Sequence, residues 1–339
     1  MPFVTTTEAG VAIQGPSATL IYDDWYPALR TSVLRKGKLA TAMLLDIPLV
    51  LGRRSDGRLF AMRDNCPHRG IPLSVGWFDG ERVTCRYHGW EFEPCSGQCE
   101  LIPSLTQHDR LEATRIYATA FPCEERDGYA WVYVPGPGLG KKTGTAERPV
   151  PQVAKFGPRY RTAHLTADLP CNVDHGIIGL MDPAHGPFVH QAWWWRSRAS
   201  IREKTKKFEP IPEGFRMSAH APSGNSAPYK LLGVYGQPVE TTIDFVLPNR
   251  RTETIRCGDK WFSSLTTVTP VAKFFGARFV RQDQVTMIQQ AEGLRHNPSL
   301  MLIDDADKPA KWYFALKQAR LDGSARHPME GPVELHWRS

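Results

Sequence analysis

The stretches CPHRG at residues 66–70 and CRYHGW at residues 85–90 decide how the first third of this chain is built. Together they give C-x-H, sixteen residues, and then C-x2-H, so each stretch supplies one thiol and one imidazole. A two-iron two-sulfur cluster can take two thiolates on one iron and two imidazoles on the other. Two hairpin tips that face each other would hold both irons at once. The predicted ligands are Cys66 and Cys85 for one iron, and His68 and His88 for the other.

A zinc ion held by the same four side chains is the alternative. Zinc modules usually pair like ligands, with Cys-x2-4-Cys followed by His-x3-5-His, and a single residue between Cys66 and His68 is awkward for tetrahedral chelation of one ion. The pattern therefore favours a cluster of the Rieske type. We expect Gly70 and Gly89 to let backbone amides approach the sulfurs, and Trp90 to pack beneath them.

The composition sets bounds on the rest of the chain. A length of 339 residues suggests two domains, and an apolar share of 41% with a charged share of 23% is typical of a globular protein. No apolar run reaches the length of about 18 residues that a membrane span needs. The first residues resemble neither a signal peptide nor a transit peptide. We therefore expect no membrane segment and a cytoplasmic protein.

Charge and cysteine content point to redox chemistry. The net charge is +7, but the basic residues form no stripe interleaved with aromatic residues, so we expect no nucleic-acid partner and favour an acidic redox partner. Seven Cys without a secretion signal favour metal or thiol chemistry over disulfides. We expect Cys95 and Cys99 to cover the cluster without chemistry of their own. The remaining thiols are expected to be buried apolar groups: Cys123, Cys171 and Cys257.

The chain changes character at a linker. Leu39 to Met62 alternates short apolar runs with turn residues, and Tyr129 to Val134 is a further strand, so the N-terminal part is predicted to be all-β. The Gly/Pro-rich stretch from Pro135 to Ala146 is typical of a linker. It separates an expected domain over residues 20–136 from an expected domain over residues 150–325.

The second domain is predicted to be α+β. Strands flanked by helices without regular alternation indicate an antiparallel sheet packed against helices. The expected elements are a strand over Arg161–Thr166, a bent helical region over Pro170–His190, strands over Thr241–Leu247, Arg251–Arg256 and Phe262–Val268, and helices over Val285–Leu294 and Lys308–Leu321.

A second metal constellation follows the linker. Asp182, His185 and His190 give D-x2-H-x4-H, and two imidazoles with a carboxylate form the facial triad of a non-haem Fe(II) site that keeps positions for dioxygen. His185 and His190 are two predicted ligands. Five residues on a regular helix separate side chains by about 140°, so we expect Gly186-Pro187 to break the winding between them. In the alternative, Asp182 is a helix N-cap and the histidines only pack.

The two constellations together resemble the Rieske ring-hydroxylating and demethylating oxygenases. The resemblance rests on CPHRG and CxYHGW, continues to Ile102-Pro103, and includes the order Rieske domain, then D-x2-H-x4-H. It implies an all-β Rieske domain followed by a helix-grip domain, and the homotrimeric branch that includes vanillate, dicamba and pheophorbide oxygenases. It also implies a terminal oxygenase that takes electrons from an NAD(P)H reductase, with or without a ferredoxin, and uses dioxygen to hydroxylate or O- or N-demethylate a small organic substrate. A dihydroxylating enzyme, a plain electron carrier and a non-catalytic binding protein of the same fold are the alternatives.

The resemblance also implies roles for two acids. Asp182 would bridge ligand His185 and the cluster ligand His88 of a neighbouring chain. The third iron ligand opens the helix after the last long strands in relatives, where this chain has Asp283. The chain departs from the family pattern at Ile178 and Gln282, where relatives often have Asn and Glu. The competitors for the third ligand are Asp304, Asp305 and Asp307.

Overall fold

The computed structural model describes residues 5–7, 10–13, 20–136, 146–152, 163–165, 169, 171–190, 198–221, 236–269, 285–286, 288–290, 300–302 and 305–338. The chain divides into two compact units. One comprises Tyr22–Ala163 with Thr269–Ala272, and the other comprises Met1–Ile21, His164–Val268 and Lys273–Ser339. Among the described helices, none is both long and apolar enough to pass through a lipid bilayer.

The Tyr22–Ala163 unit is built from short antiparallel strands. Apolar and β-branched residues dominate the central strands, and Leu49, Val50 and Leu51 are completely buried. One sheet has the order β11-β6-β5-β4 and another the order β12-β13-β3. Their strands are β3 (Asp24–Arg30), β4 (Leu39–Leu44), β5 (Ile47–Arg53), β6 (Leu59–Arg63), β11 (Ala120–Phe121), β12 (Cys123–Arg126) and β13 (Tyr129–Val134).

A third, smaller sheet in this unit supports the two Cys-His stretches. Residues 66–70 follow β6, and residues 85–90 join β8 to β9, whose Thr84 and Glu91 are paired across the hairpin. The sheet has the order β10-β9-β8-β7. Its strands are β7 (Trp77–Phe78), β8 (Val83–Thr84), β9 (Glu91–Phe92) and β10 (Cys99–Leu101).

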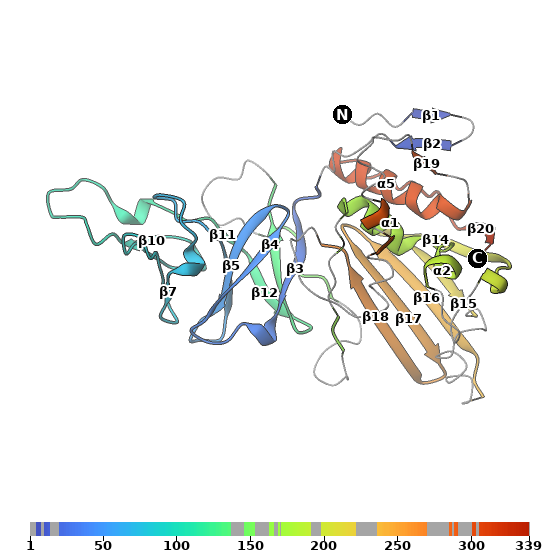
Figure 1. Cartoon of the computed structure of the whole chain (residues 1–339), viewed down its shortest axis with the longest axis horizontal. Coiled ribbons are helices and arrows are strands. Elements are labelled where there is room, and N and C mark those ends of the chain that lie inside the picture. Colours follow the sequence, from blue (N-terminus) through green and yellow to red (C-terminus); the bar gives the residue numbers. More distant parts are fainter. Residues whose placement is uncertain are drawn as a thin grey trace. The chain divides into compact units, whose positions relative to one another are not determined.

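The other unit contains a six-stranded antiparallel sheet covered on one face by helices (Figure 1). The strand order is β18-β17-β16-β15-β14-β20. The strands are β14 (Glu203–Ile211), β15 (Gly214–His220), β16 (Val239–Val246), β17 (Arg250–Cys257), β18 (Lys260–Thr267) and β20 (Val333–Arg338). The helices are α1 (Val173–Met181), α2 (Gly186–Val189) and α5 (Lys308–Leu321), and a small sheet pairs β1 (Thr5–Thr7), β2 (Gly10–Ile13) and β19 (Leu300–Leu302).

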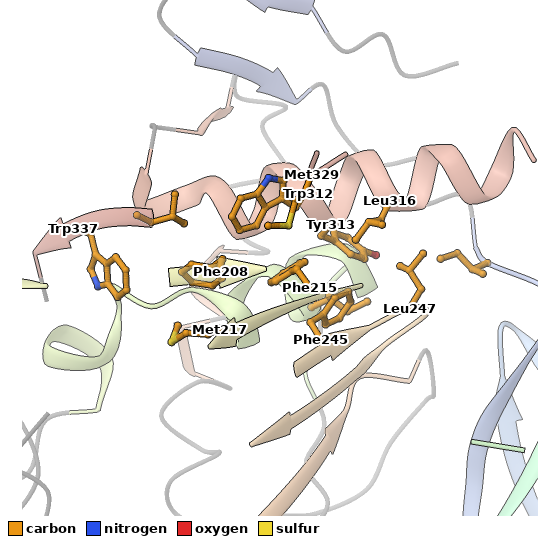
Figure 2. Packing of buried hydrophobic residues seen from close by; sticks show 13 residues of the cluster. Phe208, Phe215, Met217, Phe245, Leu247, Trp312, Tyr313, Leu316, Met329 and Trp337 are labelled. Atoms are coloured by element: carbon orange, nitrogen blue, oxygen red, sulfur yellow. The ribbon is translucent and has the colours of Figure 1, made fainter. Parts of the chain in front are cut away.

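Aromatic side chains fill the space between α5 and the sheet. Figure 2 shows Trp312 and Tyr313 pointing from α5 towards the strands that carry Phe215 and Phe245. The rings of Phe245 and Tyr313 meet edge to face with centroids 5.8 Å apart, and Phe215 lies 5.4 Å from Trp312. Ile177 of α1 belongs to the same core. One apolar cluster therefore holds the sheet, α5 and α1 together.

A β-bulge in β15 shifts the alternation of side chains between the two faces of the sheet. Met217 pairs with Ile243 of β16, but His220 pairs with Thr241, so two residues of β15 stand opposite one residue of β16. Directly paired residues share a face of the sheet. The bulge therefore places His220 on the same face as Met217, which is the face that packs on the helices.

The predicted α+β class is confirmed, with an antiparallel sheet and packed helices. The expected helix over Lys308–Leu321 is α5 itself, and three expected strands match β16, β17 and β18 within two residues. The predicted strand over Arg161–Thr166 is wrong at residues 163–165, which have no regular secondary structure. Of the expected helix from Val285, residues 285–286 and 288–290 are described and helical. Strands β14, β15 and β20 were not predicted.

Replacing Phe245 with Ala is expected to lower the free energy of unfolding by about 3–5 kcal/mol, because a buried ring leaves a cavity in a close-packed core. Phe262 of β18 is 58% exposed. Its replacement with Ala is the matched control and should change the free energy of unfolding by less than about 0.5 kcal/mol. Urea denaturation followed by circular dichroism measures both, and equal losses would contradict the assigned core.

Candidate metal centres

The two Cys-His loops have the same backbone geometry. The Gly70 N–H donates to the Cys66 carbonyl at 2.8 Å, and the Gly89 N–H donates to the Cys85 carbonyl at 3.0 Å. Both glycines have a positive φ, 73° and 70°, which side chains with a Cβ rarely adopt. The two glycines therefore close the loops, whereas the sequence analysis predicted that they let backbone amides approach the sulfurs. Each closed loop presents one thiol and one imidazole.

The two imidazoles lie side by side. The ring centroids of His68 and His88 are 4.6 Å apart, and Trp90 stacks on His68 at 4.6 Å with only 3° between the planes. Burial lowers the pKa of His68, and the neighbouring His88 and Arg69 act in the same direction. The Nδ1 atom of His68 is buried and makes no hydrogen bond with the described residues. A neutral ring with a buried, unsatisfied nitrogen fits a metal ligand.

The two thiols form the other half of the centre. Cys66 and Cys85 are each 1% exposed. Burial raises the pKa of Cys66 to about 11, helped by the Cys85 thiol within hydrogen-bonding range. A bound metal would hold Cys66 as a thiolate at neutral pH. Thiol stands beside thiol and imidazole beside imidazole, so the donors fit a two-iron cluster with like ligands on each iron better than a single zinc ion.

The other cysteines serve packing. Cys95 and Cys99 belong to the apolar cluster that includes Cys66 and Cys85, as expected. Burial raises the pKa of Cys99 to about 11 and also raises that of Cys95, so both are protonated at neutral pH. Cys257 is buried as expected, whereas Cys123 and Cys171 are only partly buried.

The second constellation begins where α1 ends. The Asp182 N–H donates to the Ile178 carbonyl at 2.9 Å, which makes Asp182 the C-cap of α1. Its backbone is extended, with φ −61° and ψ 118°, so the chain turns out of the helix. Its Oδ1 accepts from the Ala184 N–H at 2.6 Å. The alternative that Asp182 is a helix N-cap is therefore wrong.

His185 and His190 converge. The Nδ1 atom of His185 donates to the Asp182 carbonyl at 2.8 Å, while the Asp182 carboxylate lies 3.7 Å away. That hydrogen bond leaves the lone pair on Nε2 of His185, which lies 3.1 Å from Nε2 of His190. Two imidazole nitrogens bound at right angles to one metal at about 2.1 Å would lie about 3 Å apart. The pair thus fits two ligands of one ion.

The break in helical winding is not where we predicted it. Gly186 and Pro187 start α2, where Pro is tolerated in the first turn. The interruption lies at residues 182–185, and the chain leaves the helix again at His190, with φ −98° and ψ 54°. These two departures from helical geometry bring side chains five residues apart together.

The predicted third ligand, Asp283, lies outside the described residues. Asp304, one of its competitors, is not described either. Among the described residues, no group of three or more His, Cys, Asp or Glu side chains is arranged to hold one metal ion. Asp305 accepts from the backbone N–H of His336 at 2.9 Å, and Asp307 precedes α5. These two competitors occupy a helix start, as expected.

Comparison with known proteins supports the first centre. The model of the Rieske [2Fe-2S] domain matches residues 24–119, which contain both Cys-His loops. Chlorophyllide a oxygenase of Chlamydomonas reinhardtii is 34% identical over 232 residues, which are 67% of this chain and 32% of that protein. The oxygenase component of dicamba O-demethylase of Stenotrophomonas maltophilia is 32% identical over 175 residues, 51% of this chain and 49% of that protein. The chain belongs to the Rieske non-haem iron oxygenases.

Two solved structures illustrate that this fold is known. Dicamba monooxygenase bound to dicamba aligns with a TM-score of 0.68 at 21% identity, covering 91% of this chain and 100% of that one. Pseudomonas putida NdmA with caffeine aligns with a TM-score of 0.61 at 19% identity, covering 88% and 90%. The chain spans about a third of the length of the chlorophyllide a oxygenases that it matches, 32% for the algal protein.

Replacing His68 or His88 with Cys is expected to keep a two-iron cluster but to lower its reduction potential, because an all-thiolate cluster is harder to reduce than one with two imidazoles. Electron paramagnetic resonance and redox titration measure the change. His108 lies exposed in the same unit, and His108→Cys is the matched control that should leave both unchanged. An unaltered g-tensor in both ligand variants would contradict the assignment.

Proposed function

We propose that this Rieske oxygenase is a terminal oxygenase. It receives electrons from a separate NAD(P)H-dependent reductase, with or without a ferredoxin, and uses dioxygen to hydroxylate or O- or N-demethylate a small organic substrate. Cys66, His68, Cys85 and His88 hold the Rieske cluster, and His185, His190 and Asp283 hold a mononuclear Fe(II). The Rieske domain extends over residues 20–136 and the catalytic domain over residues 150–325.

The convergence of His185 and His190 carries the proposal. A protein that only transferred electrons would need the cluster loops alone. Here a second pair of imidazoles, with Nε2 atoms 3.1 Å apart, lies on another unit of the chain. Bound Fe(II) would supply open positions for activating dioxygen. Dihydroxylation remains the second candidate, because a 3-chlorobenzoate-3,4-dioxygenase subunit of Comamonas testosteroni is 28% identical over 176 residues.

The residues around the pair prepare it for this role. The Asp182 carbonyl fixes the tautomer of His185 by accepting from Nδ1 at 2.8 Å, so that Nε2 presents its lone pair. His190 is 7% exposed, which keeps bulk water from that side of the pair. We propose that Asp283 supplies the carboxylate that completes the set.

Asp182 has a second proposed role between chains. Its side chain is 33% exposed, and its Oδ2 lies within 3.7 Å of Nδ1 of His185, so the carboxylate can take another donor. His88 is also exposed. We propose a head-to-tail homotrimer, in which a heterologous contact repeated three times closes a ring and Asp182 accepts from His88 of a neighbouring chain.

The relatives suggest an organic substrate that contains a ring. The names of similar proteins refer to chlorophyllide, dicamba and chlorobenzoate. Formaldehyde release would identify demethylation, a single added hydroxyl would identify hydroxylation, and a cis-diol would identify dihydroxylation. The cytoplasm remains the predicted compartment, whereas three chlorophyllide a oxygenases among the relatives are chloroplast proteins. Cell fractionation distinguishes the two.

The reconstituted chain is expected to hold about three irons, two in the cluster and one mononuclear. His185→Ala or His190→Ala should lose one iron and all substrate-coupled oxygen uptake while the visible spectrum of the cluster persists. His336 is exposed on β20 of the same unit, so His336→Ala is the control and should keep all the iron. Metal analysis and oxygen uptake measure the outcome.

The same measurements test the third ligand. Asp283→Ala should behave like the histidine variants. Full activity in that variant would place the ligand among Asp304, Asp305 and Asp307 instead. Two irons per wild-type chain, with an intact cluster spectrum, would support the electron carrier and contradict the oxygenase.

Electron transfer between chains is tested by mixing two inactive variants. Cys85→Ser lacks the cluster and His190→Ala lacks the mononuclear iron, so mixed trimers should regain part of the activity if electrons cross from one chain to the next. Asp182→Ala should keep both metals but stop electron delivery, because the bridge is lost. Absence of any recovery, in trimers shown by mass spectrometry to be mixed, would mean that transfer occurs within a chain.

A further inference from the structure

A buried ionic contact joins α1 to α5. The Lys317 ammonium donates to both carboxylate oxygens of Asp174, at 2.7 Å each. The Tyr313 hydroxyl donates to the same carboxylate. The side chains of Lys317 and Asp174 are only 8% and 14% exposed, so both charges are largely removed from water. We call Asp174, Tyr313 and Lys317 the clamp.

Simple cohesion does not require the clamp. Removing two charges from water offsets much of their attraction, and apolar residues of similar volume often join helices as well. α1 already packs into the apolar core through Ile177 and Met181. The clamp restricts the orientation of α1 relative to α5, because three hydrogen bonds are donated to one carboxylate and each depends on its geometry. It thereby fixes the rotation of α1 and its position along α5.

The position of α1 is passed on to one histidine of the pair. α1 has only nine residues, so it spans about 14 Å and acts as one rigid segment. The side chain of its N-cap, Asn172, accepts a hydrogen bond from the backbone N–H of Asp174 at 2.9 Å. The N-cap and the clamp therefore both bind Asp174. At the other end, the Asp182 carbonyl accepts from His185.

His190 is held in another way. It follows α2, donates its backbone N–H to Gly186 at 3.0 Å, and is almost completely buried. A shift of α1 would therefore move His185 more directly than His190. The 3.1 Å separation of the two Nε2 atoms depends on where α1 lies.

We propose that Asp174, Tyr313 and Lys317 are positioning residues of the mononuclear iron site. By fixing α1 against α5 they set the separation and aim of His185 and His190. This inference rests on the proposed function, because it requires that the two histidines bind a metal.

The test uses Co²⁺ alone as the probe, added to full-length protein with the cluster intact and the mononuclear metal removed. Lys317→Met should weaken Co²⁺ binding at least about tenfold, as loss of groups that orient metal ligands does. Tyr313→Phe, which keeps the ion pair, should cause a smaller loss. The double variant Asp174→Asn with Lys317→Gln keeps uncharged hydrogen bonds and should recover most of the affinity. Equilibrium dialysis with metal analysis measures binding below the unfolding temperature of each variant.

Leu316→Ala is the matched control, because Leu316 is a buried neighbour on α5 that belongs to the same core. It should lower the melting temperature yet leave Co²⁺ affinity within about twofold. Unchanged affinity in both Lys317→Met and Tyr313→Phe, or an equal loss in Leu316→Ala, would overturn the positioning role while leaving the iron site in place. A wild-type chain that binds no Co²⁺ beside the cluster would overturn the iron site itself.

Discussion

The packing of α5 against the six-stranded sheet is the contact on which the placement of His185 and His190 depends. Phe215 and Phe245 meet Trp312 and Tyr313 there, and burial of such large rings is the main favourable term in folding a domain of this size. The same core receives Ile177 of α1. The turn that carries the two histidines is therefore positioned by apolar packing that takes no part in chemistry.

A metal ligand must present a directed nitrogen lone pair, and one histidine of each proposed centre is oriented by different means. In the first centre, burial and the stacked Trp90 hold His68, whose Nδ1 is left without a protein partner in the described region. In the second, the Asp182 backbone carbonyl accepts a hydrogen bond from Nδ1 of His185, which leaves the lone pair on Nε2. A hydrogen bond of this kind fixes the tautomer and the orientation of a histidine that binds a metal.

Features whose determinants are close in sequence could be predicted. Each Cys-His loop contains its predicted ligands and its turn glycine within six residues, and α5 is rich in strong helix formers such as Ala, Lys and Leu, with Pro in its first turn. β20 could have been recognised from its alternating Val333, Leu335 and Trp337, but β14 is rich in Lys and has no such alternation. The clamp could not be predicted, because Asp174 and Lys317 are 143 residues apart. The site residues, Asp283 among them, remain predictions.

The bulge in β15 has a consequence for how this fold can diversify. Side chains alternate between the faces of a strand with a period of two, so one extra residue would invert the facing of everything beyond it unless a bulge absorbs that residue. Deleting Ser218 or Ala219 would remove the bulge and leave one residue opposite Thr242, so His220 would still pair with Thr241 and keep its place on the helix-covered face. The strand can thus gain or lose one residue here without exchanging the side chains that line the sheet beyond it. Insertions and deletions at such a point change the length of the chain and leave the faces of the sheet as they are.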